Sequence, residues 1–181
     1  YVEYLEKNGV DAVISNSQTI KTCSDKLKFY KFCQKNSLPT IDTYQKYSSD
    51  LHNKLLLIKD RYGAGCSHIE ITKNKKNLEL IKDDKIIQPY INGDDYSISI
   101  YFTKNNFYIL TINKQILEYK NNRARLSSII VNVEHPAYLK IINLISKIKD
   151  SLPGLYGFVG VDIITKGNDI FIIDINPVSY T

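Results

Sequence analysis

Short apolar runs that alternate with polar residues dominate the chain, and this pattern predicts more strands than helices. The clearest pair of runs, residues 160–165 and 170–175, is joined by Lys166-Gly167-Asn168-Asp169. Gly and Asn favour tight turns, so this segment predicts a β-hairpin. Similar runs predict the remaining strands, which are residues 11–15, 55–59, 68–72, 86–90, 96–102 and 107–112.

Apolar residues recur at helical spacing in three segments, which are residues 1–7, 25–35 and 136–152. Ser24 is the expected N-cap of the second helix, and Pro136 suits the first turn of the third. Residues 120–128 carry basic residues and Asn without periodicity, so we expect a loop there.

Helices and strands are mixed without a regular βαβ alternation, which predicts the α+β class in two lobes. We expect residues 1–20 to be the tail of a preceding α/β domain, residues 21–87 to form the first lobe and residues 88–181 the second. The chain has no Met and starts in mid-pattern. We therefore expect a fragment that lacks most of the preceding N-terminal domain.

Composition narrows the class of protein. At 181 residues and 43% hydrophobic, the chain can bury a sizeable core. It contains no apolar run of about 18 residues and no opening signal sequence, so we expect neither a membrane span nor secretion. The three cysteines are odd in number and widely spaced, which favours reduced thiols in the cytoplasm over disulfides or a zinc site.

The net charge of +5 suits anionic ligands such as nucleotides. The densest basic run, Lys73-Asn74-Lys75-Lys76, has no interleaved aromatic residues. A solvated surface explains this run better than a nucleic-acid site.

The predicted hairpin near the end of the chain brings oxygen ligands together. With residues 167–169 as the loop, antiparallel pairing places Asp162 opposite Asp174, and the period of a strand returns Asn176 to the same face. Two carboxylates about 5 Å apart among apolar residues repel each other and are costly to desolvate. A bound cation resolves that conflict, and these hard oxygen ligands suit Mg²⁺ or Mn²⁺. A solvated hairpin rim with unrelated aspartates is the alternative.

A second candidate site follows the apolar run 55–59. Lys59 ends that run, and the next residues include Gly63-Ala64-Gly65. Glycines let backbone N–H groups approach phosphate oxygens, while a fixed lysine neutralises their charge. The segment is neither a P-loop nor a dinucleotide fingerprint. An ordinary turn beside a surface lysine is the alternative.

Four motifs occur together in one order: Ser24-Asp25-Lys26, Lys59 with its glycine loop, Gln88 to Asp95, and Asp162 with Asp174-Ile175-Asn176-Pro177. In order and spacing they resemble the ATP-grasp superfamily, and in particular the carbamoyl-phosphate-synthase-like carboxylate-amine ligases, a group that includes the tyramine-glutamate ligases. The run from Leu152 to Asp162 is also similar to the segment that leads into the metal strand of that group. The resemblance covers about residues 20–181.

The resemblance implies a two-lobed ATP-grasp fold with the nucleotide between the lobes. It implies roles for these residues: Lys26 and Lys59 on the α- and β-phosphates; Gly63, Ala64 and Gly65 in a flap over the triphosphate; the backbone of Gln88, Pro89, Tyr90 and Ile91 at adenine; Asp95 at the ribose; and Asp162, Asp174 and Asn176 on Mg²⁺.

The cations near the transferred phosphate depart from the family pattern. Val178 follows Asn-Pro where related ligases often carry Arg, and Lys114 stands in an Asn-Lys-Gln run where they carry Asn-Arg-Gln. Lys114 is then expected to face the phosphate, and Arg123 and Arg125 are expected to supply further positive charge. Surface arginines are the alternative for these two.

The implied activity is ATP-dependent ligation, in which a carboxylate is activated as an acyl phosphate and joined to an amine. Two alternatives stay open, an ATP-binding regulatory module with impaired catalysis and an ATP-dependent phosphotransferase. The implied partners are ATP, a small carboxylate, a small amine and, as an option, further copies of the chain. No nucleic acid or membrane is expected.

Overall fold

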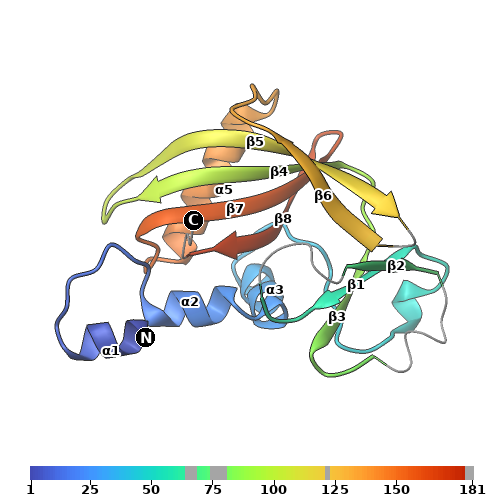
Figure 1. The fold of residues 1–181 in the computed structure, drawn as a ribbon, viewed down its shortest axis with the longest axis horizontal. Helices are drawn as coiled ribbons and strands as arrows, with labels where there is room; N and C mark the ends of the chain where they lie inside the picture. The colour runs from blue at the N-terminus through green and yellow to red at the C-terminus, as the bar shows by residue number, and fades with distance from the viewer. Residues whose placement is uncertain (64–68, 74–80, 121–122, 178–181) are drawn as a thin grey trace.

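The computed structural model describes residues 1–63, 69–73, 81–120 and 123–177. Within these ranges the strands form one eight-stranded sheet with the order β3-β1-β2-β6-β5-β4-β7-β8, and neighbouring strands in it are antiparallel (Figure 1). The strands are β1 (Leu56–Asp60), β2 (Glu70–Thr72), β3 (Lys85–Pro89), β4 (Asp94–Phe102), β5 (Phe107–Lys120), β6 (Arg123–Ile130), β7 (Gly157–Lys166) and β8 (Asp169–Asn176).

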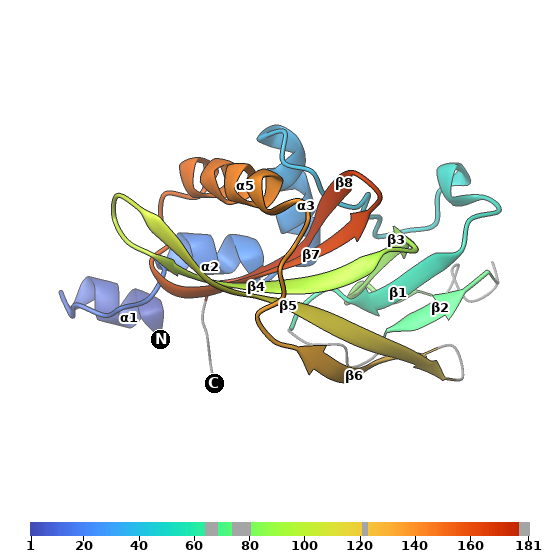
Figure 2. The same ribbon diagram turned by 90° about the horizontal axis from the view of Figure 1, so that it is seen from above.

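The helices are α1 (Val2–Lys7), α2 (Ser17–Cys23), α3 (Lys26–Lys35), the 3₁₀ helix η1 (Ser49–Leu51) and α5 (Tyr138–Ser151). In Figure 2, α2, α3 and α5 lie along one side of the strands β4, β7 and β8. None of the helices in the described ranges is long and apolar enough to cross a membrane.

The larger hydrophobic core lies between that side of the sheet and the helices. Ile98 and Ile100 of β4 pack there with Ile141 and Ile145 of α5, and all four side chains are fully buried. The predicted helical stripe of residues 136–152 therefore faces the core. Phe29 of α3 belongs to the same core, so α3 packs on the strands of residues 94–176.

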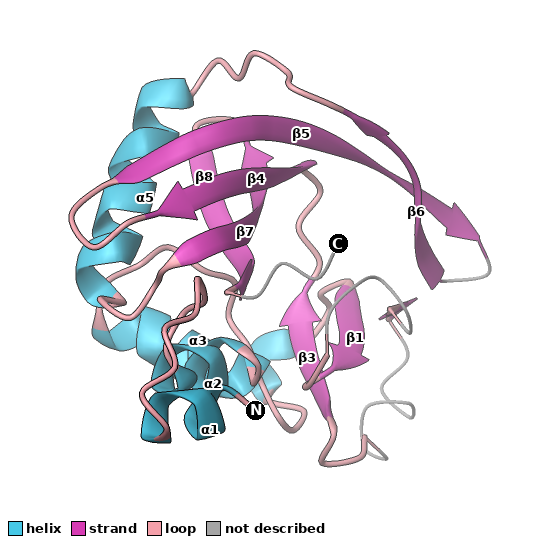
Figure 3. Ribbon diagram, turned by 60° about the vertical axis from the view of Figure 1, so that its left-hand side comes forward, coloured by secondary structure: helices cyan, strands magenta, loops and turns pink. Residues whose placement is uncertain are grey.

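A second, smaller core lies under β1 and β3. It joins Leu51, the last residue of η1, to Leu56, Ile58 and Ile87. Figure 3 shows the long strands β5 and β6 running from the larger group of strands toward β1 and β3. The sheet thus curls between two separate cores, as the prediction of two lobes in an α+β fold requires. The division at residues 20, 87 and 88 stays a prediction.

The start of the chain differs from the prediction. The prediction of a strand at residues 11–15 is wrong, because these residues adopt an irregular path. The helix α2 follows, with Asn16 as its N-cap: the Asn16 side chain accepts a hydrogen bond of 2.8 Å from the Thr19 N–H. Thr19 and Cys23 are buried, so tertiary packing stabilises a helix that the sequence pattern did not reveal.

The predicted N-cap of the next helix is displaced by one residue. Ser24 ends α2, and its hydroxyl donates to the Ile20 carbonyl at 2.7 Å. Asp25 caps α3, since its Oδ1 accepts from the N–H groups of Leu27 and Lys28 at 3.1 and 3.2 Å. A carboxylate at this position also favours the helix dipole.

The prediction of a loop at residues 120–128 is wrong. The strand β5 continues to Lys120, and β6 starts at Arg123. The two strands pair from Lys120 opposite Arg123 to Lys114 opposite Ile130. Most side chains of this ribbon are exposed, so neither face shows the apolar alternation that identifies a half-buried strand. Residues 121–122 lie outside the described residues.

Candidate functional site: a carboxylate cluster beside an interlobe cavity

The hairpin of β7 and β8 pairs Asp162 with Asp174, as predicted. The route to that pairing differs, because Lys166 pairs with Asp169 and leaves a loop of only Gly167 and Asn168. Gly167 has φ +59°, a backbone conformation that glycine adopts without strain in such turns. The register shifts again between Asp162 and Ile163, and this irregularity restores the pairing of the two aspartates.

Asn176 joins the two aspartates. Its Nδ2 donates to Asp162 Oδ2 at 3.3 Å. Since β8 pairs Asn176 with Gly160, two residues before Asp162, its side chain lies beside that carboxylate. The three predicted metal ligands therefore converge on one part of the hairpin.

Asp95 extends this carboxylate cluster from the neighbouring strand β4. Burial, with a further contribution from the nearby charge of Asp162, raises the pKa of Asp95 to about 6. Burial likewise raises the pKa of Asp162 to about 6, against the lowering effect of a hydrogen bond from Ser97. Burial also raises the pKa of Asp174, while Lys26 and Lys59 lower it. Three crowded carboxyl groups are thus held with too little positive charge nearby.

This cluster fits a divalent cation. A cation would relieve the repulsion that raises the carboxyl pKa values, and carboxylate and amide oxygens are ligands that Mg²⁺ accepts. In the described ranges no three Asp, Glu, His or Cys side chains form a complete metal cage. That finding agrees with a Mg²⁺ site in which Asp162, Asp174 and Asn176 supply only some of the ligands, since Mg²⁺ commonly keeps waters and takes phosphate oxygens from a substrate.

Two lysines from the first half of the chain reach the cluster. The Lys26 ammonium, at the first residue of α3, lies 3.6 Å from Asp174 Oδ2 and donates to the Gly63 carbonyl at 2.5 Å. Lys59 on β1 is 7% exposed, and its charge lowers the pKa of Asp95, Asp162 and Asp174. Both predicted phosphate-binding lysines therefore lie at the carboxylates.

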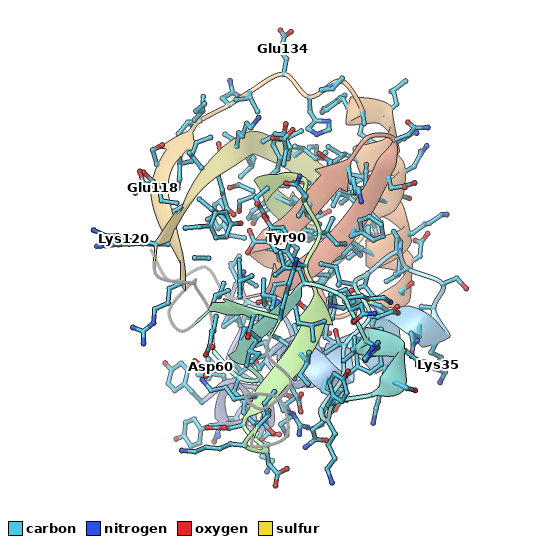
Figure 4. All side chains as sticks on the ribbon, turned by 90° about the vertical axis from the view of Figure 1, so that its right-hand side faces the viewer. Lys35, Asp60, Tyr90, Glu118, Lys120 and Glu134 are labelled. Carbon is cyan, nitrogen blue, oxygen red and sulfur yellow. The ribbon has the colours of Figure 1, made fainter. Side chains whose placement is uncertain are left out.

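A cavity of about 100 Å³ opens beside Lys59, Asp95 and Asp162. Its walls come from β1, β3 and the strands of the larger lobe, and Figure 4 labels Tyr90 between those two parts of the molecule. The lining residues are Ile41, Leu57, Lys59, Ile69, Gln88, Pro89, Tyr90, Ile91, Asp95, Gln115, Leu117, Tyr119, Ala124, Asp162, Ile164 and Ile173. The lining combines apolar and aromatic side chains with three charged groups, those of Lys59, Asp95 and Asp162.

The segment Gln88–Ile91 was predicted to present its backbone to a ligand. The Gln88 side chain is buried and donates to Thr43 Oγ1 at 2.8 Å, which fixes the end of β3. The Tyr90 N–H donates to the Leu55 carbonyl at 2.8 Å, and Pro89 has no N–H. Among the residues that the structure describes, the Ile91 N–H has no backbone partner and is the donor this segment can offer to the cavity.

Residues 23–181 match a family described as the ATP-grasp domain. The chain belongs to the ATP-grasp family. Its curated relatives include a tyramine–L-glutamate ligase from Methanocaldococcus fervens, which is 30% identical over 173 residues, or 96% of this chain and 51% of that protein. The chain spans about half the length of the curated relative and of the solved structures it matches.

Solved structures with the same fold are ATP-grasp ligases and synthetases. An L-amino acid ligase from Bacillus licheniformis is 16% identical with a TM-score of 0.78, covering 97% of this chain and 45% of that one. The N5-carboxyaminoimidazole synthetase from Staphylococcus aureus, solved with ADP, is 17% identical with a TM-score of 0.77, covering 97% and 50%. At these identities the likeness shows the fold alone.

Three basic side chains that were predicted to lie near the transferred phosphate, those of Lys114, Arg123 and Arg125, lie away from the cavity. Lys114 forms a 2.9 Å salt bridge with Asp94, and strand alternation places it on the face opposite Gln115, which lines the cavity. Arg123 and Arg125 are exposed and flank Ala124, another lining residue, so they lie on the outer face of β6. The structure therefore does not bring these three side chains to the carboxylates.

The glycine flap is only partly described. Gly63 has φ +95°, and its carbonyl receives the Lys26 hydrogen bond. The predicted flap residues Ala64 and Gly65, and the departure at Val178, lie outside the described residues.

Several site residues were missed from the sequence. Leu117, Ile164 and Ile173 form apolar walls, Thr43 holds Gln88, and Ser97 hydrogen-bonds Asp162. The strand pairing of Ser97 with Asp162 could have been found only with the register of β4 against β7. The apolar residues carry no chemical pattern that separates them from ordinary core residues.

Proposed function

We propose that this ATP-grasp chain is the nucleotide-binding part of an ATP-dependent ligase that activates a carboxylate as an acyl phosphate and joins it to an amine. The observation that carries the proposal is the carboxylate cluster of Asp95, Asp162 and Asp174 with Lys26 and Lys59, beside the interlobe cavity that Lys59, Asp95 and Asp162 line. Similarity to relatives that include a tyramine–L-glutamate ligase supports the same class of reaction.

The apolar and the charged residues that line the cavity suit different parts of ATP. The apolar walls of Leu117, Ile164 and Ile173 suit a purine ring, and the Ile91 N–H can donate to a ring nitrogen. Asp95 can accept hydrogen bonds from ribose hydroxyls. The cavity of about 100 Å³ is smaller than a typical ligand pocket of roughly 300–1,000 Å³, so nucleotide binding requires the lobes or the flap to move apart.

The lysines of the cluster would bind the phosphates. Lys26, which contacts Asp174, and Lys59, whose charge acts on all three carboxylates, can neutralise phosphate oxygens instead, and the burial of both lysines strengthens this attraction. Asp162, Asp174 and Asn176 would hold Mg²⁺ or Mn²⁺, which when bound neutralises phosphate charge and polarises the phosphoryl group.

The reaction needs no side-chain nucleophile. An oxygen of the substrate carboxylate attacks the γ-phosphorus, the bond to the β-phosphate oxygen breaks, and ADP leaves. The amine then attacks the acyl carbon, inorganic phosphate leaves, and the amine loses a proton. Lys59 would stabilise the negative charge that develops on the phosphoryl oxygens during the first step.

The test is ADP release from a panel of amino acids and amines, each supplied alone and together. A ligase releases ADP only when a suitable acid and amine are both present, and mass spectrometry should find the amide. Release with acid alone would indicate a phosphotransferase instead. Absence of release across the panel with intact ATP binding would contradict the ligase proposal.

The positions of Lys114, Arg123 and Arg125 favour one second candidate, an ATP-binding module without turnover. In the described ranges, Lys59 is the only lysine or arginine that lines the cavity, and Lys26 forms a salt bridge with Asp174 of the neighbouring carboxylate cluster. Isothermal titration that detects ATP binding, together with an unproductive panel, would support this candidate.

The cellular setting is also a proposal. Cys23 and Cys33 are buried free thiols, and burial raises the pKa of Cys33 to about 12, so both are kept protonated and unreactive. Reduced buried thiols agree with a cytoplasmic enzyme. Small acid and amine substrates and a homo-oligomer complete the proposed partners.

A further inference from the structure

A second cavity, of about 540 Å³, lies on the opposite face of the sheet from the carboxylate cluster. Asp94 and Tyr96 of β4 form one wall, and the residues that lead into α5 form another. The hairpin turn at Asn168 closes a third side. Asp94 lines this cavity while the next residue, Asp95, lines the interlobe cavity, so β4 separates the two.

His135, which lines this cavity, carries an unpaired hydrogen-bond donor. The side chain is 8% exposed, and its Nδ1 accepts a hydrogen bond of 3.0 Å from the Ala137 N–H. A neutral imidazole then carries its proton on Nε2. Burial lowers the pKa of His135, which keeps the ring neutral. In the described part of the chain Nε2 has no hydrogen-bond partner, so a buried N–H lacks an acceptor.

The start of α5 adds backbone donors beside His135. The N-cap residue Ala137 supplies no side-chain hydrogen bond to this 14-residue helix. The Tyr138 N–H is taken by the His135 carbonyl, but the N–H groups of Leu139 and Lys140 have no partner outside the helix among the described residues. Helix N-termini with free N–H groups attract anions.

The charged side chains around this cavity also favour an anion. Asp94 is neutralised by its 2.9 Å salt bridge with Lys114. The Lys140 ammonium instead donates to the backbone and side-chain oxygens of Asn168, which carry no charge. The positive charge of Lys140 is therefore not cancelled by these contacts.

We propose that the cavity at the start of α5 binds a small anionic ligand, with a carboxylate or phosphate group against His135, Lys140 and the first N–H groups of the helix. An oxyanion supplies the acceptors that these donors lack. The Tyr96 ring, Leu139 and Ile170 would contact the uncharged part of the ligand. The volume is that of a metabolite-sized pocket. This inference does not depend on ATP binding.

The experiment follows the imidazole resonances of His135 in isotope-labelled protein by NMR. Inorganic phosphate and acetate are titrated separately at pH 7.5, with sodium chloride adjusted to keep the ionic strength constant. We expect a saturable downfield shift of the His135 Nε2–H signal with at least one of them. Saturation by phosphate alone identifies a phosphate site, and saturation by acetate alone a carboxylate site.

Two variants separate a specific site from general charge attraction. Lys140→Gln keeps a polar side chain on the same helix turn and should raise the dissociation constant of the anion by about tenfold. Lys147→Gln removes the same charge from an exposed position farther along α5 and should leave it unchanged. The proposal is overturned if neither anion gives a saturable shift, or if both variants weaken binding equally.

Discussion

The ammonium of Lys26 lies 3.6 Å from the carboxylate of Asp174, so a helix start in the first half of the chain and a strand near its end meet in one charge pair. Both side chains are only 11% exposed. If a cation and phosphates bind here as proposed, Lys26 must give up part of its contact with Asp174. The Gly63 carbonyl, which Lys26 also contacts, links this exchange to the start of the glycine flap.

Replacing Asp174 should therefore separate nucleotide binding from folding. Asp174→Ala removes one oxygen ligand and also one member of a repelling carboxylate cluster. We expect Mg²⁺-ATP affinity, measured by isothermal titration, to fall by about thirtyfold or more, equivalent to about 2 kcal/mol. The melting temperature without ligand should stay close to that of the parent protein.

The matched control is Asp169→Ala, which removes the same carboxylate from the exposed start of the same strand. It should change neither nucleotide affinity nor stability. Unchanged ATP affinity in Asp174→Ala would count against the carboxylate cluster as the metal site.

Lys59→Met tests the role of the lysine whose positive charge acts on all three carboxylates of the cluster. Lys59 is buried and lowers the pKa of three aspartates, so its loss leaves those carboxylates less compensated. We expect turnover to fall by about a hundredfold, because charge stabilisation in a dry site is lost where the phosphoryl group reacts. ADP release in the coupled assay measures this.

Lys54→Met, at an exposed position before β1, provides the comparison for Lys59→Met. The same loss of turnover in both variants would show that net charge, and not the position of Lys59, matters.

The hairpin of β7 and β8 could be predicted from the sequence because its pattern is local. The pairing of Asp162 with Asp174 was predicted with a three-residue loop, whereas the loop has two residues and a register shift after Asp162 corrects the offset. Either change alone would have moved Asp174 out of register with Asp162, since a slip of one residue turns a strand over. The prediction was right about the pair and wrong about the path to it.

The face of Lys114 could not be read from its motif. Asp95 pairs with Gln115, so Gln115 shares the face of the interlobe cavity and Lys114 must lie on the other. That pairing joins β4 and β5, whose register shifts between Ser99 and Ile100. No local sequence pattern predicts this shift. A motif identifies the residue type at a position. The face of the sheet on which that side chain lies can be known only from the register of the strands.

Asp25 is predicted to be a stabilising residue of the first lobe. It caps α3 and forms two hydrogen bonds with the Arg61 guanidinium, at 2.8 and 2.7 Å. Asp25→Ala should lower the free energy of unfolding by about 2–4 kcal/mol, from the lost cap and an unpaired arginine. Asp25→Asn keeps a capping oxygen and should cost less. Urea denaturation at pH 7 measures both.

The Asp25 contacts also predict a dependence on pH. Burial alone would raise the pKa of Asp25, but the Arg61 hydrogen bonds and the N–H groups of α3 outweigh it and lower the pKa below its usual value. A lowered native pKa means that the stabilisation is present above about pH 3.9, the unfolded value, and is lost as the pH falls through the native pKa. The stability gap between the parent and Asp25→Asn should therefore close in acid. A constant gap down to about pH 2 would contradict this assignment.

Lys114→Gln provides the sharpest contrast between the motif and the structure. Its ammonium pairs with Asp94 and lies 5.9 Å from the Tyr96 ring centroid, on the face away from the interlobe cavity. Because Asp94 is largely exposed and its charge is screened by solvent, the variant should lose only about 0.2–1 kcal/mol of stability. ATP affinity and turnover should stay within about twofold of the parent, within the scatter expected for a surface substitution of about 0.5 kcal/mol. A fall in turnover as large as that of Lys59→Met would place Lys114 at the transferred phosphate, as its motif suggested, and would require β5 to change register when substrate binds.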